Sequence, residues 1–164
     1  MEGDGFSEWY EREHPRLIST LAIVSGHLDE AVDATDEAFA RALDRWGSVS
    51  QMASPTGWTY QVALNRLRRQ MRRAELERRA LGRRQSRATV PLPDPDVWDA
   101  VRSLPLRRRT AVVLRYVADL TEAEIATAMG ISRGTVAATL STARKSLAIA
   151  LHDPDMEEVT RGRA

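Results

Sequence analysis

The stretch LTEAEIATAMGISRGTVAATLSTARKSL, Leu120–Leu147, predicts two helices separated by a tight turn. Thr121 and Glu124 have the spacing of a capping box, in which the threonine hydroxyl accepts from the Glu124 N–H and the glutamate reaches back to the cap. Gly130 suits the left-handed residue that ends a helix, and Ser132 can cap the next one. The compact turn favours a helix-turn-helix over an ordinary helical hairpin, and a helix-turn-helix places its second helix in a DNA groove.

The second helix of this stretch combines an apolar face with a small, nearly neutral outer face. The apolar residues recur at spacings of four, three and four and therefore share one side: Val136, Leu140, Ala143 and Leu147. A rotation of about 100° per residue then directs outward Gly134, Ala138, Ser141, Thr142 and Lys145, with Arg133 and Arg144 on a flank. Small residues can contact thymine methyl groups but offer little bidentate hydrogen bonding to bases, so this helix alone predicts a weak reader of DNA.

Charge is unevenly distributed along the 164 residues, although the formal net charge is only +1. Residues 1–65 contain 4 Arg against 11 Asp and Glu, whereas residues 66–87 contain 10 Arg against 2 Glu. Residues 88–164 are balanced. An arginine block this dense favours a polyanion partner over a merely solvated helix face. The acidic block beside it indicates a second partner of a different kind.

The composition argues against a disulfide-bonded, secreted or membrane-inserted protein. The absence of cysteine excludes disulfides and thiolate metal sites, and it is compatible with a reducing cytosol. No run of about 18 apolar residues exists, which argues against membrane insertion. The acidic N-terminal stretch lacks the apolar segment of a signal peptide, so we expect a cytoplasmic protein.

The helical pattern predicts an all-α chain of two small helical domains joined by a flexible linker, the second with the helix-turn-helix. Pro15 is expected to end or kink the first helix near His14, because proline lacks an N–H. The other predicted elements of the first half are a helix over 31–46, a loop over 47–57 and a helix over 58–81. The four predicted helices of the second half cover 97–104, 107–117, 121–129 and 132–151. The expected organisation is a domain over 1–81, a Gly- and Pro-containing linker over 82–96, a domain over 97–152 and a polar tail over 153–164.

Four segments carry the motifs of one known family. They read FSEWYEREHPRLISTLA from Phe6, DEAVDATDEAFARALDRW from Asp29, PTGWTYQVALNRLRRQMRR from Pro55, and SLPLRRRTAVVLRYVADLTEAEIATAMGISRGTVAATLSTARKSL from Ser103. In this order and spacing they resemble the extracytoplasmic-function (ECF) sigma factors of bacterial RNA polymerase, in the sigma-70 superfamily. The resemblance implies a first domain that binds the polymerase β' clamp and the −10 promoter element. It implies a second domain that binds the −35 element and the polymerase β flap.

The resemblance also implies roles for individual residues. Core polymerase binding falls on Asp33, Asp36, Glu37 and Arg41. Binding of −10 DNA falls on Ser48, Ser50, Gln51 and Ser54 of a loop that captures a flipped base, and on Tyr60, Asn65, Arg66, Arg68, Arg69, Arg72 and Arg73. Binding of −35 DNA falls on Arg133, Gly134, Thr135, Ala138, Ser141, Thr142, Arg144 and Lys145. Trp58 is expected in the core of the first domain, and the second is expected to pack around Leu104, Val112, Val113, Leu114 and Tyr116.

The chain departs from the family most clearly in the recognition helix. Relatives often read TVKSRLSRAR where this chain reads TVAATLSTAR, so basic residues are replaced at Ala137, Thr139 and Thr142. Each lost phosphate contact lowers the salt slope of DNA binding by about 0.9. We therefore expect low-specificity −35 recognition, assisted by the polymerase through a second, intramolecular contact.

Alternative functions remain open at the level of sequence. A helix-turn-helix regulator would keep the DNA contact without the polymerase, and a degenerate sigma-like protein would bind polymerase without efficient −35 recognition. The three histidines form no metal or catalytic motif, so we expect neither an enzyme nor a bound cofactor. An anti-sigma factor is a further partner that the resemblance implies.

Overall fold

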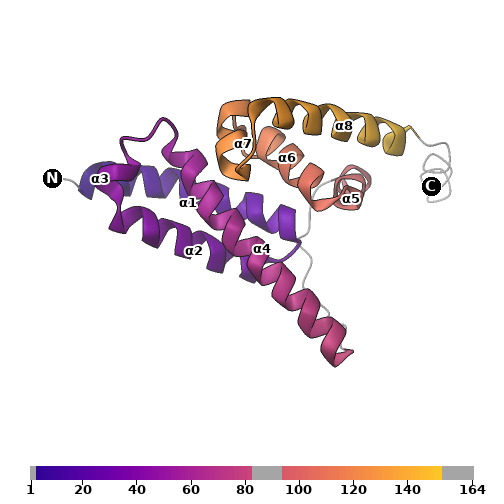
Figure 1. The fold of residues 1–164 in the computed structure, drawn as a ribbon, viewed down its shortest axis with the longest axis horizontal. Helices are drawn as coiled ribbons and strands as arrows, with labels where there is room; N and C mark the ends of the chain where they lie inside the picture. Colours follow the sequence, from indigo (N-terminus) through magenta and orange to yellow (C-terminus); the bar gives the residue numbers. More distant parts are fainter. Residues whose placement is uncertain (1–2, 83–93, 153–164) are drawn as a thin grey trace.

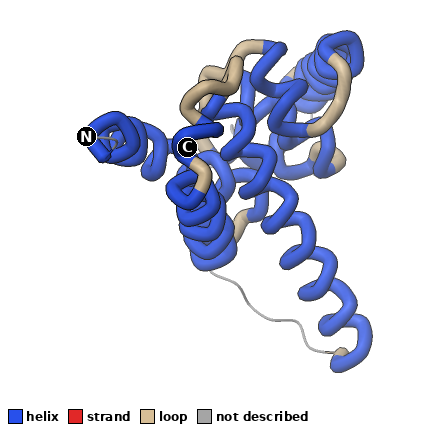
Figure 2. The backbone as a smooth tube through the Cα atoms, turned by 60° about the vertical axis from the view of Figure 1, so that its left-hand side comes forward, coloured by secondary structure: helices blue, strands red, loops and turns tan. Residues whose placement is uncertain are grey.

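The computed structural model describes residues 3–82 and 94–152, and every regular element in these residues is a helix (Figures 1 and 2). The first half contains α1 (Gly3–Ser25), α2 (Leu28–Asp44), α3 (Trp46–Val49) and α4 (Pro55–Leu81). The second half contains α5 (Pro95–Ser103), α6 (Leu106–Tyr116), α7 (Glu122–Met129) and α8 (Arg133–Leu151). The all-α prediction is confirmed. Most of the predicted linker and the whole predicted tail lie outside the described residues, and α5 begins two residues earlier than predicted.

The first domain packs α1, α2 and α4 around an aliphatic core. Leu17, Leu21 and Val24 of α1 are at most 1% exposed, and they pack with the alanine-rich inner face of α2. Of the two predicted effects of Pro15, an end or a kink of the helix near His14, the end is wrong, because α1 runs through Pro15 without a break. Proline removes one backbone hydrogen bond, but buried side chains on both sides of Pro15 keep the two segments packed as one helix.

The loop between α2 and α4 is shorter than predicted. Gly47 lies in the short helix α3, and Gly57 lies in the first turn of α4. Only residues 50–54 connect these two helices. Ser54 caps α4, since its hydroxyl accepts from the Gly57 N–H at 2.9 Å, and Pro55 follows at the first helical position. Both signals belong to a helix N-terminus, so they start α4 three residues before the predicted helix.

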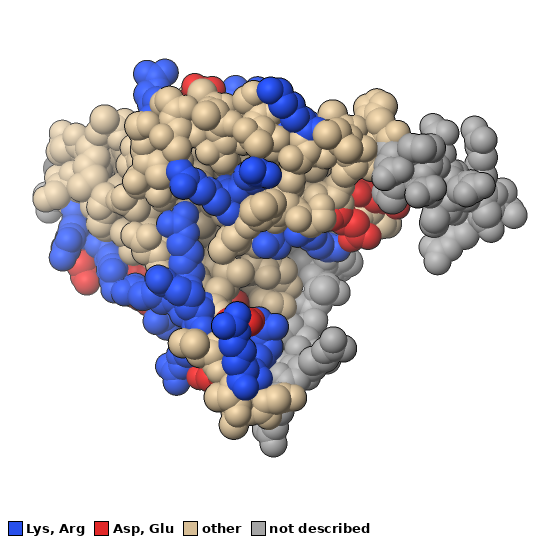
Figure 3. Space-filling model, turned by 45° about the vertical axis from the view of Figure 1, so that its right-hand side comes forward, with Lys and Arg blue, Asp and Glu red and all other residues tan. Residues whose placement is uncertain are grey.

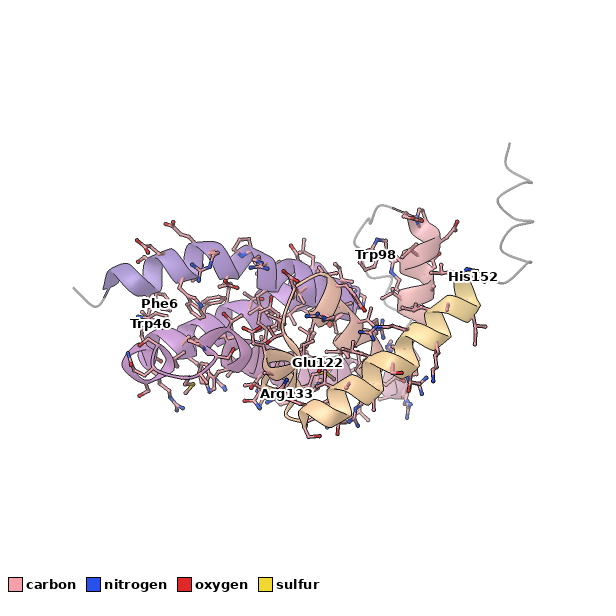
Figure 4. All side chains as sticks on the ribbon, turned by 90° about the horizontal axis from the view of Figure 1, so that it is seen from above. Phe6, Trp46, Trp98, Glu122, Arg133 and His152 are labelled. Atoms are coloured by element: carbon pink, nitrogen blue, oxygen red, sulfur yellow. The ribbon has the colours of Figure 1, made fainter. Side chains whose placement is uncertain are left out.

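An aromatic cluster closes the end of the first domain. The ring of Trp9 lies 4.9 Å from Phe39 and 4.9 Å from Trp46, and Phe6 packs edge-on against Trp46 at 5.2 Å. Figure 4 shows Phe6 and Trp46 side by side at this end of the molecule. The cluster fixes α3 against α1 and α2, and with it the start of the loop that leads into α4.

The second domain forms the predicted helix-turn-helix. The Thr121 N–H donates to Glu124 Oε2 at 2.8 Å, and the Glu124 N–H donates to Thr121 Oγ1 at 3.2 Å, so the capping box is confirmed. Gly130 adopts the left-handed conformation with φ of 65°, and Ser132 caps α8 by accepting from the Thr135 N–H at 3.1 Å. These caps are followed by the buried face of α8, in which Val136, Leu140 and Ala143 are fully buried.

Tyr116 does not belong to the core of the second domain, and its predicted packing role is wrong. Its side chain is 58% exposed at the end of α6. The hydroxyl accepts from Arg144 Nε at 2.7 Å, and the Arg144 guanidinium lies 6.0 Å from the ring centre. Tyr116 therefore holds one arginine of the recognition helix against the surface.

The two domains pack directly against each other, with α7 on the first part of α4 and α6 beside α1. Gly57 makes the close approach possible, because a Cβ atom there would lie 3.2 Å from Thr127 Cβ and 3.3 Å from the Glu124 carbonyl oxygen. Arg16 of α1 donates to the Ala118 carbonyl at 3.1 Å. We call this the closed arrangement. The second half of α4 takes no part in it and projects beyond the other helices (Figures 1 and 2).

Candidate functional site

The exposed face of α2 carries the acidic residues that sequence analysis selected. Alanines at intervals of three and four turn one side of α2 inward, and this turns Asp33, Asp36 and Arg41 outward to exposed positions. Asp36 Oδ1 lies 2.8 Å from His14 Nε2 on α1. Among the residues that the structure describes, Asp33 has no ion-pair partner, so its charge is available to another molecule.

Glu37 is half-buried and links α2 to α4. Its carboxylate accepts from Arg41 Nη2 at 2.5 Å, and its other oxygen lies 2.9 Å from Arg66 Nε. Ion pairs this exposed contribute about 0–1 kcal/mol each. Glu37 therefore positions Arg66 along α4 more than it stabilises the fold.

The connection over residues 50–54 presents polar side chains next to the start of α4. Gln51 is exposed, Ser50 is half-buried, and Ser48 is exposed on the preceding helix α3. Ser54 is half-buried, and its hydroxyl is already used as the cap of α4. The predicted base-capturing residues are thus brought together on one short surface, with Ser54 acting first as a structural residue.

Tyr60 corrects the sequence-based assignment. It was predicted to bind −10 DNA, but its side chain is 1% exposed and belongs to the core between α1 and α4. Its hydroxyl lies 3.4 Å from Thr20 Oγ1, and burial raises its pKa. Tyr60 lies on the inner side of α4, and a base cannot reach its ring while α1 is packed against it.

The arginines of α4 form a basic surface along the projecting half of the helix (Figure 3). Arg73 pairs with Glu77 at 2.9 Å, and Arg78 and Arg79 share Glu75. Within the described residues, Arg68, Arg69 and Arg72 have no acidic partner, and Asn65 is exposed beside them. Burial and the positive charges of Arg107 and Arg72 lower the pKa of Arg68. The surface therefore carries unneutralised positive charge suited to phosphate groups.

The outer face of α8 is exposed as predicted. Gly134, Ala138, Ser141, Thr142 and Lys145 are all accessible, and Arg133 is exposed at the first turn. Thr135 is half-buried and bonds to Ser132. The helix can enter a groove without steric obstruction from its own side chains. Its positive charges lie at Arg133, Arg144 and Lys145, and Arg144 is held by its hydrogen bond to Tyr116.

Sequence reasoning missed two arginines that flank this helix. A groove of about 350 Å³ separates the N-terminus of α6 from α8, and Arg107 and Arg108 line it opposite Thr135, Ala138, Thr139 and Thr142. The run PLRRR at residues 105–109 carried the charge signal. Nothing in the sequence placed it beside a helix about thirty residues later.

The described parts of the chain contain no arrangement for a metal or a membrane span. Over residues 3–82 and 94–152, no group of three or more His, Asp or Glu side chains is placed to hold a metal ion. None of the helices in those residues combines the length and the hydropathy needed to cross a membrane.

Comparison with known proteins gives matches across both domains. The family described as Sigma-70 region 2 matches residues 9–77, and the one described as Sigma-70, region 4 matches residues 96–147. RNA polymerase sigma factor SigV of Bacillus subtilis is 27% identical over 132 residues, which cover 78% of this chain and 80% of the relative. RNA polymerase sigma-E factor of Streptomyces antibioticus is 28% identical over 166 residues, which cover 92% of this chain and 88% of the relative.

A solved structure has the same overall fold. The sigma factor RpoE of Bartonella quintana, crystallised in complex with the anti-sigma factor NepR, superimposes with a TM-score of 0.78 at 20% sequence identity. The match covers 91% of this chain and 98% of that one. The two domains and their helix order are therefore shared along nearly the whole length.

Proposed function

Because this chain belongs to the sigma-70 family, in its extracytoplasmic-function group, and directs transcription initiation by RNA polymerase, we propose how its surfaces divide that work. We assign the polymerase and −10 functions to a domain over residues 1–81. The −35 and flap functions fall to a domain over residues 95–152, which starts where α5 begins. Each assignment rests on exposure and charge in the described residues.

The acidic face of α2 is the proposed contact with the polymerase clamp. Asp33 and Asp36 are exposed, and their positions are not needed to pack the helix. Opposite charges across an interface speed the encounter and fix its register more than they add affinity. Arg41 and Glu37 complete the surface as an ion pair at its edge.

The connection over residues 50–54 and the basic face of α4 are the proposed −10 surface. A flipped base needs a pocket that returns its unstacking cost of a few kcal/mol, and Ser50 and Gln51 supply polar atoms there. The arginines that follow on α4 are placed to bind the phosphates of the same strand. Tyr60 has no part in this proposal, because it is buried.

The outer face of α8 is the proposed −35 surface, and the closed arrangement must open for it to be used together with the −10 surface. The names of the two elements place their centres 25 positions apart, which corresponds to about 85 Å of straight duplex. In the closed arrangement, α7 touches the start of α4. One body of about 160 residues has a radius of gyration of only about 15 Å, so it cannot reach both elements at once.

The observation that carries this assignment is the exposed acid face of α2, on which Asp33 has no ion-pair partner in the described residues, in a chain whose α4 is strongly basic. The test is the double charge reversal Asp36→Lys and Glu37→Lys. We expect loss of binding to purified core polymerase and loss of promoter-dependent transcription in vitro. Retention of core binding would remove the clamp assignment.

A matched control separates this outcome from misfolding. Asp44→Lys changes an exposed acid at the end of the same helix, outside the proposed surface. We expect it to leave core binding intact. Circular dichroism of both variants reports whether α2 remains helical, and only a helical double variant tests the proposal.

Further partners and properties follow from the same family membership. RpoE of Bartonella quintana was solved with the anti-sigma factor NepR, and we propose that a protein inhibitor of this class also binds this chain. We propose a cytoplasmic, non-enzymatic factor that needs no cofactor. Pull-down with this chain as bait, followed by an inhibition assay of transcription in vitro, tests the inhibitor proposal.

A further inference from the structure

A histidine of α1 contacts one of the exposed acids on α2. His14 Nε2 lies 2.8 Å from Asp36 Oδ1, which is hydrogen-bond distance. The exposed fraction of the side chain is 18% for His14 and 60% for Asp36. The contact therefore joins a largely covered ring to a carboxylate that another molecule can reach.

Aromatic packing fixes the position of the His14 ring. Its centre lies 4.5 Å from the ring centre of Tyr10 and 5.3 Å from that of Phe39. Tyr10 and Phe39 also pack edge to face at 5.1 Å, and Phe39 is buried. Rings at these distances adopt defined mutual orientations. The ring nitrogen of His14 therefore has a fixed place beside Asp36.

The contact between His14 and Asp36 is not needed to hold the first domain together. α1 and α2 already pack through buried aliphatic side chains, among them Leu17, Leu21 and Ala34. A polar pair with one partner this exposed contributes little to stability, because water competes for the carboxylate. What the contact does fix is the orientation of the Asp36 side chain.

Asp33 provides a contrast on the same face of α2. It is exposed three residues before Asp36, and within the described residues it has no ion-pair partner. Its side chain is free to change rotamer until a partner binds. Ordering a mobile side chain on binding opposes association, whereas a side chain that is already held does not add this cost. Asp36 is therefore organised for binding in a way that Asp33 is not.

We propose that His14 is a positioning residue for polymerase binding, and that it holds the Asp36 carboxylate in the orientation in which a cationic side chain of the polymerase binds it. His14 contacts only Oδ1, and a carboxylate has two oxygens that accept hydrogen bonds, so the second oxygen remains available. The inference rests on the proposed contact between this face of α2 and the polymerase clamp. It adds a residue of α1 to that contact.

The first test compares core binding by variants at position 14. His14→Phe keeps an aromatic ring against Tyr10 and Phe39 but removes the ring nitrogen. We expect it to bind purified core polymerase about fivefold more weakly. His14→Gln keeps an N–H group that can reach the carboxylate, and it should recover part of the affinity. His152→Phe is the control and should bind normally, because His152 lies at the end of α8 and contacts the Ala148 carbonyl.

Binding kinetics separate positioning from charge. His14→Phe leaves the negative charge of Asp36 in place, so the association rate, which follows long-range charge, should be unchanged or higher. The weaker binding should appear in the dissociation rate, which surface plasmon resonance measures on immobilised core polymerase. Tighter binding by His14→Phe would show that the histidine only screens Asp36, and it would overturn the proposal.

A double-mutant cycle shows whether His14 acts through Asp36. We expect Asp36→Ala to weaken core binding, and His14→Phe to cause no further loss in that background. In the matched Asp33→Ala background, His14→Phe should keep its full effect. Losses that add in the Asp36→Ala background would overturn the proposal. Circular dichroism checks the fold of each variant, and His14→Leu, which also lacks the ring nitrogen, replaces His14→Phe if that variant misfolds.

The outcomes distinguish this inference from the proposed function. Retained core binding by the charge-reversed variant, Asp36→Lys with Glu37→Lys, would remove the clamp contact itself and the role of His14 with it. If charge reversal abolishes binding but His14→Phe or Asp36→Ala has no effect, the clamp contact remains supported and only the positioning role is overturned.

Discussion

The two helices proposed to contact DNA, α4 and α8, differ in where they carry their charge. α4 has 27 residues, and its projecting half carries a row of arginines that few acids neutralise. α8 has 19 residues, and its outer face is small and nearly neutral, with one of its arginines bound to Tyr116. The difference suggests that one helix of this factor can supply attraction to DNA phosphates while another supplies contacts to base edges.

This division has a physical consequence for promoter binding. Phosphate contacts supply most of the affinity and fix position, whereas contacts to base edges specify sequence. A helix that contacts the DNA groove through Ala138 and Thr142 makes few phosphate contacts, so another surface must supply the binding affinity. We propose that in the assembled enzyme α4 and the polymerase both hold α8 on the DNA, so that the α8 contact becomes intramolecular.

The largest expected effect is on the salt dependence of DNA binding when positive charge is removed from α4. The triple change Arg68→Gln, Arg69→Gln and Arg72→Gln should lower the salt slope of random-duplex binding by about 2.7, because each phosphate contact contributes about 0.9. The corresponding change on α8, Arg133→Gln with Lys145→Gln, should lower it by no more than about 1.8. Anisotropy titrations of the full-length chain across a salt series give both slopes. An α8 change as large as that of α4 would break the comparison.

Adding positive charge to α8 should make its DNA binding as dependent on salt as that expected of α4. Ala137→Lys with Ser141→Lys adds two cations at exposed positions and avoids Thr139, which faces Arg107 and Arg108 across the groove. We expect the salt slope to steepen by about 1.8, with similar gains on a −35 duplex and a random duplex. Gains restricted to the −35 duplex would show that α8 already reads sequence.

A smaller effect, on the free energy of unfolding, is expected at the contact between α4 and α7 that joins the two domains. Gly57→Ala places a Cβ 2.8 Å from Ser54 Oγ and 3.2 Å from Thr127 Cβ. Such overpacking costs about 1–3 kcal/mol, while alanine returns up to about 1 kcal/mol of helix propensity. Urea unfolding should show a net loss of stability. Gly47→Ala is the matched control, because a Cβ there meets nothing within 4 Å, and it should be neutral or stabilising.

The smallest effect concerns pH and the inner side of α4. Burial raises the pKa of Tyr60 above its usual 10.0, so the folded chain favours the neutral phenol. The stability that this provides is complete below about pH 10 and is lost as pH rises through the higher folded pKa. Ultraviolet titration should show Tyr60 ionising late or with unfolding, and Tyr60→Phe should remove the alkaline loss. Early ionisation of all three tyrosines would place Tyr60 at the surface.

The helix-turn-helix was predictable because its signals are local. Thr121, Glu124, Gly130 and Ser132 act within a few residues of one another, and all four behave as the sequence indicated. The outward face of α8 followed from helical periodicity alone. The start of α4 was equally local, but the cap at Ser54 was read as part of a loop.

The closed arrangement was not predictable, because its contacts join residues far apart in the chain. Gly57 looked like a loop glycine, yet its lack of a side chain admits Thr127 from the other domain. The missed arginines Arg107 and Arg108 belong to the same class, since only tertiary structure sets them beside α8. The DNA-binding role predicted for Tyr60 was wrong for a simpler reason. The sequence pattern placed Tyr60 on a helix but did not show which side of that helix packs against α1.

The aromatic cluster at the end of the first domain provides an intrinsic fluorescence signal that reports on this domain. Three of the four tryptophans lie in this domain, and Trp9 and Trp46 are within energy-transfer contact of each other, just before the connection that leads into α4. Trp98 is the remaining tryptophan and sits on α5 (Figure 4). Tryptophan emission from a chain with Trp98 replaced by Phe would therefore come from the first domain alone, and quenching by an unpaired DNA strand would be seen without any added dye.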